Sequence, residues 1–484
     1  MRALLFLAAT ASVAPFDVRT ASDPAPEQAE ADRQRWSGEA FQTGWRPELP
    51  LEERMAGLAL LWAEVRYGFA NFDLVPEVDW DAEYLAMIPR VAAAESTDAY
   101  YALLAELAAK LRDGHTSITP PRELQRRGAI PGLLTELVED RVVVAHVLGA
   151  EFLDAEIERG DELVTIDGVE VRAHADARIR PYQSSSTPHH LDRIVFEWRL
   201  LEGPVGPVEL GFRTRDGDAI TVASRRLSAE EWEFVPVQRP ADPPAYRRTM
   251  LPGDVAYVEL NSFVDSTVRE SFAADFDEIA RAKAVILDVR RNLRGNGAVG
   301  FDVLAHFTDA PFAVSSWGAL RYSAVRRAWG RPAEFERRTG NTWRAGPEAC
   351  YRGPVIVLTS AHTFSAAEDF AAAFDALGRG KIVGETTAGS TGQPLSFRLP
   401  GGGYGRFTAK RDTYPDGSEF VGRGIAPDVA AAPTIEDFVE GVDTVLERAL
   451  EVLAERWRSC RPHQESVRTR NQRGNRVDGS GSPP

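Results

Sequence analysis

The chain has 484 residues, of which 44% are hydrophobic and 26% are charged. These proportions exclude a mostly disordered chain, and the length predicts about two to four domains. The formal net charge of −16 argues against a nucleic-acid partner, because phosphate binding needs concentrated positive charge.

The first 22 residues have the pattern of a signal peptide. Met1 and Arg2 precede a short apolar run that is followed by small residues. The pattern predicts an exported protein, periplasmic or extracellular. The run is shorter than the roughly 20 residues of a membrane-spanning helix, so no membrane span is expected. Residues 23–49 are rich in Ala, Asp, Glu and Pro and are predicted to be a linker.

Residues 50–122 are expected to form an N-terminal helical domain. Apolar side chains recur there at steps of three and four residues, as at Leu58, Leu61 and Val65. The pattern ends at the loop 112–116, which contains His115.

Residues 125–232 are predicted to form a compact β module. The apolar run 142–144 is typical of a strand, and Asp167-Gly168 is a hairpin turn signal between two short strands. A later strand is expected over 208–214, where apolar and polar residues alternate.

From residue 245 to residue 450 the pattern changes to alternating strands and helices. The continuous apolar runs 284–289 and 355–358 are typical of strands covered on both faces. This alternation predicts an α/β domain with a largely parallel sheet. Helices are expected over 266–282, 298–309 and Ser365–Leu377, with Gly378 capping the last.

The remaining features exclude several kinds of site. Two cysteines, Cys350 and Cys460, are too few for a disulfide framework, and whether they pair stays open. The eight histidines show no metal-ligand spacing, so no metal and no cofactor is expected. Residues 455–484 are basic and are predicted to be a disordered tail.

Ser365 is the first candidate for chemistry, because it follows a predicted strand and opens a predicted helix. It could be a helix N-cap, for which serine is well suited. It could instead be a nucleophile at the carboxyl edge of the sheet, with the backbone N–H of Ala366 facing an oxyanion. The local sequence leaves both interpretations open.

A nucleophilic serine needs a base, and two loop histidines are candidates. His362 lies three residues before Ser365, whereas His115 lies in a distant loop. Composition does not choose between them. The glycine-containing loop 288–297 lacks the endings of phosphate-binding loops, so nucleotide binding is rejected.

Seven short segments, spread over most of residues 50–440, carry further information. They are Leu111–Thr116, Gly160–Leu163 with Ile166–Gly168, Val258–Phe263, Asp288–Asn292, Thr363–Glu368, Val383–Gly389 and Gly424–Asp428. Each segment is weakly diagnostic alone. Together, and in this order, they resemble the C-terminal-processing, or tail-specific, serine peptidases, a family that includes the tricorn core protease.

The resemblance implies a catalytic core like that of crotonases and Clp peptidases, joined to a PDZ-like module that recognises peptide C-termini. It implies peptide or protein substrates, Ser365 as nucleophile, and the N–H groups of Ala366 and Gly295 as oxyanion donors. A different class of function stays open: a catalytically inactive peptide- or ligand-binding protein on the same scaffold.

The resemblance also bears on the base. Many members use a serine–lysine dyad, but Ser390 occupies the matching lysine position, and the chain has only four lysines. This favours the branch similar to the tricorn core, in which histidine is held by a hydroxyl and a glutamate. His115 matches that histidine, and Glu419 is the expected orienting residue, with Glu368 and Glu385 as rivals.

Overall fold

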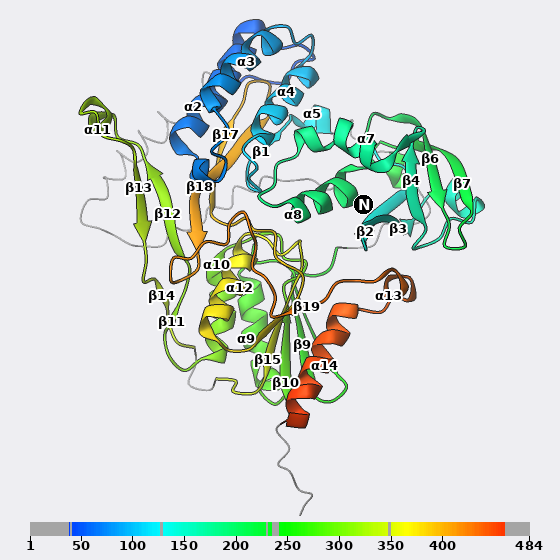
Figure 1. Cartoon of the computed structure of the whole chain (residues 1–484), viewed down its shortest axis with the longest axis vertical. Coiled ribbons are helices and arrows are strands. Elements are labelled where there is room, and N and C mark those ends of the chain that lie inside the picture. Colours follow the sequence, from blue (N-terminus) through cyan, green and yellow to red (C-terminus); the bar gives the residue numbers. More distant parts are fainter. Residues whose placement is uncertain are drawn as a thin grey trace, which may run out of the picture.

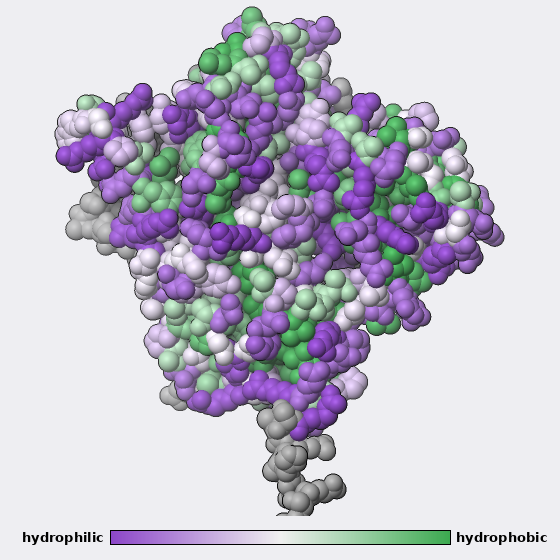
Figure 2. Space-filling model, in the orientation of Figure 1, coloured by the Kyte–Doolittle hydropathy of each residue, from purple (hydrophilic) through white to green (hydrophobic). Residues whose placement is uncertain are grey.

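The computed structural model describes residues 38, 41–125, 129–228, 231–234, 242–346 and 350–459. Three parts surround a common centre: a helical part, a β module and an α/β core (Figure 1). Hydrophilic residues cover most of the face shown in Figure 2, interrupted by apolar patches over the β module and the lower core. In the part of the chain that the structure describes, no helix is long and apolar enough to cross a membrane. The expected signal peptide, Cys460 and nearly all of the expected tail lie outside the described residues.

The helical part packs around one apolar cluster. Its buried side chains include Leu58, Leu61 and Val65, the residues whose spacing predicted a helix. Asp79 and Ser96 cap two of its helices through their side chains. The helices are α2 (Leu51–Gly68), α3 (Trp80–Ala92), α4 (Thr97–Ala109) and the short α5 (Arg122–Gln125).

The β module, residues 129–228, is a curved antiparallel sheet with helices against it. The strand order is β2-β3-β4-β6-β7, and β5 pairs with β4 across the Asp167-Gly168 turn. Its strands are β2 (Leu133–Val138), β3 (Arg141–Val147), β4 (Glu162–Ile166), β5 (Val169–Glu170), β6 (Gly206–Arg213) and β7 (Ala219–Arg226).

Helices occupy much more of the β module than the sequence pattern indicated. The chain leaves β5 after two residues because the Glu170 side chain caps a new helix by accepting from two backbone N–H groups. Pro188 stands at the first turn of another helix, a position that favours proline and would have signalled it. The helical segments are α6 (Ala150–Asp154), α7 (Val171–Arg178), α8 (Pro188–Arg193) and a π-helix (Ile194–Arg199).

The α/β core is built on a six-stranded sheet in the order β19-β16-β15-β10-β9-β8. All neighbouring strands are parallel except the β8–β9 pair. The expected parallel sheet is therefore present, and the two apolar runs are β10 and β15. The strands are β8 (Tyr246–Leu251), β9 (Val255–Leu260), β10 (Ala284–Asp288), β15 (Val355–Thr359), β16 (Lys381–Gly384) and β19 (Val429–Ala430).

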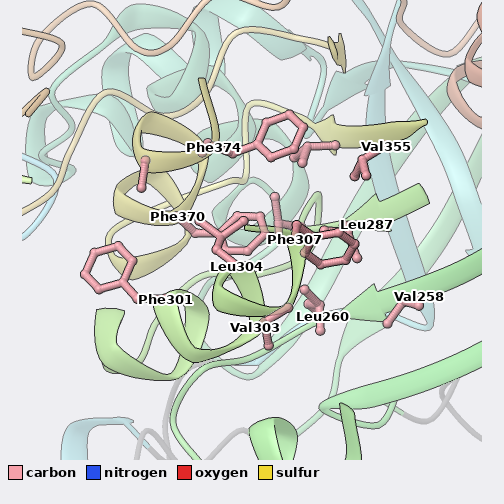
Figure 3. Close-up of a cluster of buried hydrophobic side chains, with 14 of the residues drawn as sticks. Val258, Leu260, Leu287, Phe301, Val303, Leu304, Phe307, Val355, Phe370 and Phe374 are labelled. Atoms are coloured by element: carbon pink, nitrogen blue, oxygen red, sulfur yellow. The ribbon is translucent and has the colours of Figure 1, made fainter. Parts of the chain in front are cut away.

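Helices cover both faces of this sheet, which explains why its strands are continuously apolar. On one face Phe370 and Phe374 of α12 pack with Leu304 of α10 over Leu287 and Val355 (Figure 3). On the other face α14 covers the alternate side chains of the same strands. The helices are α9 (Thr267–Ile279), α10 (Gly297–Leu304), α12 (Ala366–Leu377), α13 (Ile435–Glu440) and α14 (Thr444–Ser459).

A second, antiparallel sheet joins the helical part to the core. Its order is β1-β18-β12-β13, with β17 also paired to β18. Phe407 of β18 is buried in the apolar cluster of the helical part, so this strand fixes the position of that part. The strands are β1 (Ser117–Thr119), β12 (Ser316–Arg321), β13 (Glu334–Arg338), β17 (Gln393–Arg398) and β18 (Tyr404–Thr413), with α11 (Ala324–Ala328) between β12 and β13 and a separate pair β11 (Phe312–Ala313) and β14 (Thr342–Trp343).

Candidate active site

Ser365 lies in a sharp turn between β15 and α12. Its backbone has φ 59° and ψ −124°, a left-handed conformation that costs a residue with a side chain about 1–3 kcal/mol. Although Ser365 occupies the N-cap position of α12, its side chain makes no cap hydrogen bond. The strained turn therefore presents the hydroxyl away from the helix, and the N-cap interpretation fails.

Neighbouring loops hold this turn in place. The N–H of Ser365 donates to the carbonyl of Ser390 at 3.0 Å, and the N–H of Phe364 donates to the carbonyl of Asn292 at 3.1 Å. Asn292 is fully buried, and its amide donates to the Leu260 carbonyl at 2.8 Å. The serine turn is thus tied both to the Ser390 loop and to the loop that leaves β10.

His115 contacts Ser365, although 250 positions separate the two residues in the sequence. Its Nε2 lies 3.1 Å from the Ser365 Oγ. The ring also packs on Phe364, with centroids 4.6 Å apart, and is almost completely buried. This is the distance and environment expected for a hydroxyl that can pass its proton to an imidazole.

The loop carrying His115 is anchored by a buried aspartate. Asp113 accepts hydrogen bonds from the hydroxyls of Thr116 (2.7 Å) and Thr408 (2.8 and 3.0 Å) and from the amide of Asn71 (3.1 Å). Because Thr408 is on β18, the His115 loop is fixed to the strand that also positions the helical part.

Ser390 contacts the other nitrogen of His115. Its Oγ lies 3.4 Å from His115 Nδ1. For the Ser365 hydroxyl to donate to Nε2, the imidazole proton must sit on Nδ1, and Ser390 Oγ is placed to accept it. The Ser390 hydroxyl therefore favours the tautomer that leaves Nε2 free to accept.

Glu368 holds the Ser390 loop from inside the core. Its buried carboxylate accepts from the Ser390 N–H (2.7 Å), the Gly389 N–H (2.7 Å) and the Thr387 hydroxyl (2.6 Å). Glu368 follows Ser365 by three positions on α12, so the same helix start carries the serine and the carboxylate. A chain of contacts results, running from Ser365 through His115 and Ser390 to Glu368.

Burial sets the charge state of these groups. Desolvation, with smaller contributions from the positive Arg406 and from His190 and Lys410, holds the pKa of His115 well below its usual value. The imidazole is therefore neutral at neutral pH, which is the form that can accept a proton. Desolvation raises the pKa of Glu368 to about 7, although the hydrogen bonds that it accepts partly oppose the shift.

Two backbone N–H groups are candidates for an oxyanion site. Ala366 is the first residue of α12, where an N–H has no intrahelical partner. Gly295 has φ 141° and forms an isolated parallel bridge with Phe263. In a parallel bridge, the residues just before and just after Gly295 make the hydrogen bonds to Phe263. The N–H of Gly295 itself therefore points away from Phe263. A side chain at Gly295 would approach the Phe263 carbonyl carbon to 2.1 Å, which explains the glycine.

The β module also touches this site through a run of hydroxyl residues. The Ser186 Oγ accepts from the Gly114 N–H at 3.0 Å, and the Ser184 hydroxyl donates to the Asp113 carbonyl at 2.9 Å. The Thr187 hydroxyl donates to the Ala388 carbonyl at 2.8 Å. Sequence reasoning passed over this run, whose only signal was its unusual content of serine.

The other predicted candidates lie elsewhere. Glu419 is not brought to His115: it pairs with Arg411 (3.4 Å) and Arg337 (3.6 Å), and Arg411 lies on the face of β18 opposite Thr408. Of its rivals, Glu385 pairs with Arg193 at 2.7 Å, which leaves Glu368 as the glutamate connected to His115. His362 is bonded to Glu197 at 2.7 Å rather than to Ser365.

The four lysines are engaged with carboxylates. Each of the four lysines, all described by the structure, pairs with a carboxylate: Lys110 with Glu83, Lys283 with Asp254, Lys381 with Asp428 and Lys410 with Asp412. Among the described residues, no group of three or more His, Cys, Asp or Glu side chains could hold a metal ion.

Comparison with known proteins identifies the core. Residues 254–431 match the model of Peptidase family S41. These residues form a peptidase family S41 domain. The match contains β9, β10, β15, α12 and the Ser390 loop, so Ser365, Glu368 and Ser390 all belong to the S41 domain, whereas His115 is contributed from outside it. The resemblance inferred from the short segments is thereby confirmed.

Relatives of the S41 domain extend the likeness over most of the chain. A Streptomyces coelicolor protein (strain ATCC BAA-471 / A3(2) / M145) named "Putative tricorn protease homolog 2" is 26% identical over 417 residues. The match covers 82% of this chain but 32% of that protein, so this chain spans about a third of the length of its curated relative.

Solved structures show that the fold is shared well beyond the S41 domain. Mature CPAF superposes with a TM-score of 0.68 at 15% identity, covering 85% of this chain and 98% of that one. CPAF complexed with lactacystin gives a TM-score of 0.66 at 15% identity, with 84% and 98% covered. At this identity the likeness establishes the fold, and the expected mixed α/β class is confirmed.

Proposed function

We propose that this chain is a serine peptidase that hydrolyses peptide bonds of peptide or protein substrates near their C-termini. Ser365 is the nucleophile, and His115 is the general base and then the general acid. The observation that carries the proposal is the 3.1 Å approach of His115 Nε2 to Ser365 Oγ on a strained turn. The S41 domain match supports the same reaction class.

In this mechanism the Ser365 hydroxyl loses its proton to His115 Nε2 as its oxygen attacks the substrate carbonyl carbon. The N–H groups of Ala366 and Gly295 stabilise the negative charge that develops on the carbonyl oxygen. His115 then passes the proton to the leaving amine, and a water molecule releases the acyl group by the reverse sequence.

Ser390 and Glu368 are positioning residues rather than catalytic ones. Ser390 accepts the Nδ1 proton and keeps the imidazole in its productive tautomer, while Glu368 fixes the Ser390 loop through three hydrogen bonds. This assignment replaces Glu419 with Glu368, acting through a hydroxyl. Export to the periplasm or beyond, suggested by residues 1–22, remains part of the proposal.

Site-directed variants test the assignment with a mixed peptide substrate library. Ser365→Ala and His115→Ala should both reduce hydrolysis to the same low floor, because groups that act as a unit give non-additive losses. His362→Ala should keep substantial activity, since His362 is bonded to Glu197. Full activity of Ser365→Ala with a retained fold would overturn the proposal, and an inactive His362→Ala beside an active His115→Ala would overturn the choice of base.

A further inference from the structure

The hairpin of β12 and β13, with α11 at its end, is an arm that projects from the left side of the molecule in Figure 1. Most residues of its tip, residues 322–333, are exposed. Trp329 is 67% exposed and Val325 is 55% exposed. Because apolar side chains gathered on a projecting surface are commonly covered by a partner, the tip has the character of a docking surface.

Local contacts hold the tip in one shape. The Ser323 side chain caps α11 by accepting from the Arg326 N–H, and the Arg326 guanidinium pairs with Glu334 of β13 at 3.3 Å. Where the tip joins β12, Tyr322 packs on Tyr67 of α2, with ring centroids 4.6 Å apart. A surface that is already held in shape loses little conformational freedom when it binds a partner.

The tip is positively charged, although the chain as a whole is acidic. Residues 322–333 contain three arginines and no acidic residue, whereas the formal net charge of the chain is −16. One of these arginines, Arg331, lies over the Trp329 ring at 5.8 Å from its centroid. A complementary partner therefore offers an apolar recess with negative charge beside it.

A hollow of about 250 Å³ between the end of α2 and the start of α3 has both features. Segment 71–83 supplies all of its lining except Arg66, and this segment contains five acidic residues and no basic one. Asp79 and Asp81 line the hollow, and Arg66 is paired with Asp81 at 3.3 Å. The apolar lining consists of Phe72, Val75, Pro76, Val78 and Trp80. The hollow thus matches an indole ring that is flanked by arginines.

We propose that this chain forms a two-fold dimer in which the tip of each arm docks in the hollow of the other copy. Trp329 enters the hollow, and Arg331 faces its carboxylates. On one copy the arm adjoins the hollow, because Tyr67, the neighbour of Arg66, packs on Tyr322. Two copies can therefore exchange arms reciprocally, which is the self-complementary contact of a two-fold dimer. The inference is independent of the proposed peptidase activity.

Sedimentation velocity over a concentration series tests the proposal. The wild-type chain should dimerise at micromolar concentration, and added salt should weaken the dimer because exposed charges contribute to it. Trp329→Ala should weaken dimerisation about tenfold or more. Leu153→Ala, which shortens another exposed apolar side chain, on α6 of the β module, should dimerise like the wild type. A wild-type chain that stays monomeric at about 100 μM, or a Trp329→Ala variant that dimerises normally, would overturn the proposal.

A charge exchange tests the pairing of tip and hollow. Arg331→Asp and Asp81→Arg should each weaken dimerisation about tenfold, and the double variant should recover part of the loss because its reversed charges attract again. Arg141→Asp, which reverses an exposed arginine at the start of β3, is the control and should leave dimerisation unchanged. If both single variants are weakened, circular dichroism shows retained folds and the double variant recovers nothing, the pairing is wrong.

Disulfide trapping between copies locates the contact. In a background with Cys350→Ser and Cys460→Ser, chains carrying Ala328→Cys are mixed with chains carrying Pro76→Cys and oxidised. This mixture should give a cross-linked dimer on a non-reducing gel, whereas Ala328→Cys mixed with Leu153→Cys should not. The absence of a cross-link in the first mixture, or equal cross-linking in both, would overturn the proposal.

An anionic lipid surface is the other partner that a basic tip with a tryptophan could meet, although it would repel the acidic body of the chain. Vesicles of phosphatidylglycerol and phosphatidylcholine in equal parts separate the two partners. The wild-type chain should not co-sediment with them. Co-sedimentation of a monomeric chain that is lost in Trp329→Ala would assign the tip to lipid and overturn the dimer.

Discussion

At the scale of single residues, the candidate site places the hydroxyl of Ser390, rather than a lysine, against the second nitrogen of His115. A lysine base must lose its proton before it can act, whereas the buried His115 is already neutral. The cost is that the imidazole must be held in one tautomer. The Ser390 hydroxyl contacts His115 Nδ1, and the Ser390 backbone N–H donates to Glu368. Ser390 therefore links the proposed base, His115, to the buried glutamate.

Removal of the Ser390 hydroxyl should therefore affect turnover more than binding. In Ser390→Ala, Nδ1 loses its acceptor, and we expect kcat to fall about 10- to 100-fold with KM nearly unchanged. Steady-state kinetics on one peptide substrate gives the split. Ser396→Ala, an exposed serine on β17, is the control and should be neutral. An unchanged kcat for Ser390→Ala would show that the tautomer is fixed elsewhere.

The burial of His115 predicts where the acid limb of the pH profile lies. Its pKa is lowered, so the neutral, proton-accepting form persists as pH falls below the usual histidine value of about 6.5. Glu368 also titrates, with a pKa raised to about 7, so the limb due to His115 is measured in Glu368→Gln, which removes that carboxyl group. In this variant we expect kcat/KM to stay level through pH 6.5 and to fall only at lower pH, and a midpoint at or above 6.5 would contradict the lowered pKa of His115.

At the scale of elements, two helix starts and two loops converge at the carboxyl edge of a parallel sheet. The β10 exit loop supplies Gly295, and the turn after β15 supplies Ser365 and Ala366. Position 295 requires a glycine for two reasons. Its φ of 141° is a conformation that residues with a side chain rarely adopt, and a Cβ there would collide with the backbone of Phe263.

Two alanine substitutions at neighbouring glycines test the oxyanion loop. Gly295→Ala must displace the loop from Phe263, so we expect kcat to fall about 100-fold or more, as for loss of an oxyanion donor. Gly297→Ala is the matched control, since its Cβ would meet nothing closer than 3.5 Å, and it should keep wild-type activity. Circular dichroism of both variants checks that the fold is retained. Equal activities would remove Gly295 from the oxyanion site.

Local patterns predicted the elements of the core better than those of the β module. The runs that became β10 and β15 are buried on both faces, and Gly378 caps α12 in a left-handed conformation as expected. The helices between residues 171 and 199 were not predicted. The residues that indicate where they begin, the N-cap Glu170 and the first-turn Pro188, lie in polar sequence without a clear apolar period. The pairing of His115 with Ser365 also had no local signal, since it depends on the β1–β18 pairing.

At the scale of the whole molecule, the site lies where the helical part, the β module and the core meet (Figure 1). The helical part supplies the His115 loop, and the core supplies the serine and its support. The β module adds the hydroxyl groups of Ser184, Ser186 and Thr187, which contact the His115 loop and the Ser390 loop. The pairing of Glu419 was not predictable from sequence, because it depends on which face of β18 its partner Arg411 occupies in the assembled sheet.

The contact between Thr187 and Ala388 tests whether the β module supports the site. Thr187→Val keeps the shape but removes the hydrogen bond to the loop that carries Ser390, so we expect a several-fold lower kcat and faster amide exchange in that loop. Thr135→Val is the matched control, because it removes a similar buried bond, to the Phe196 carbonyl, within the β module. Both variants should lose about 1–3 kcal/mol of stability. Equal kcat values for the two would show that the contact is only structural.

The central claim is that His115 activates Ser365 as a nucleophile, and covalent labelling tests it most directly. A fluorophosphonate should attach to one residue of the wild-type chain, and peptide mass spectrometry should place the adduct on Ser365. The label should vanish in Ser365→Ala, slow strongly in His115→Ala and persist in His362→Ala. An unlabelled wild-type chain, or labelling of His115→Ala at the wild-type rate, would contradict the claim.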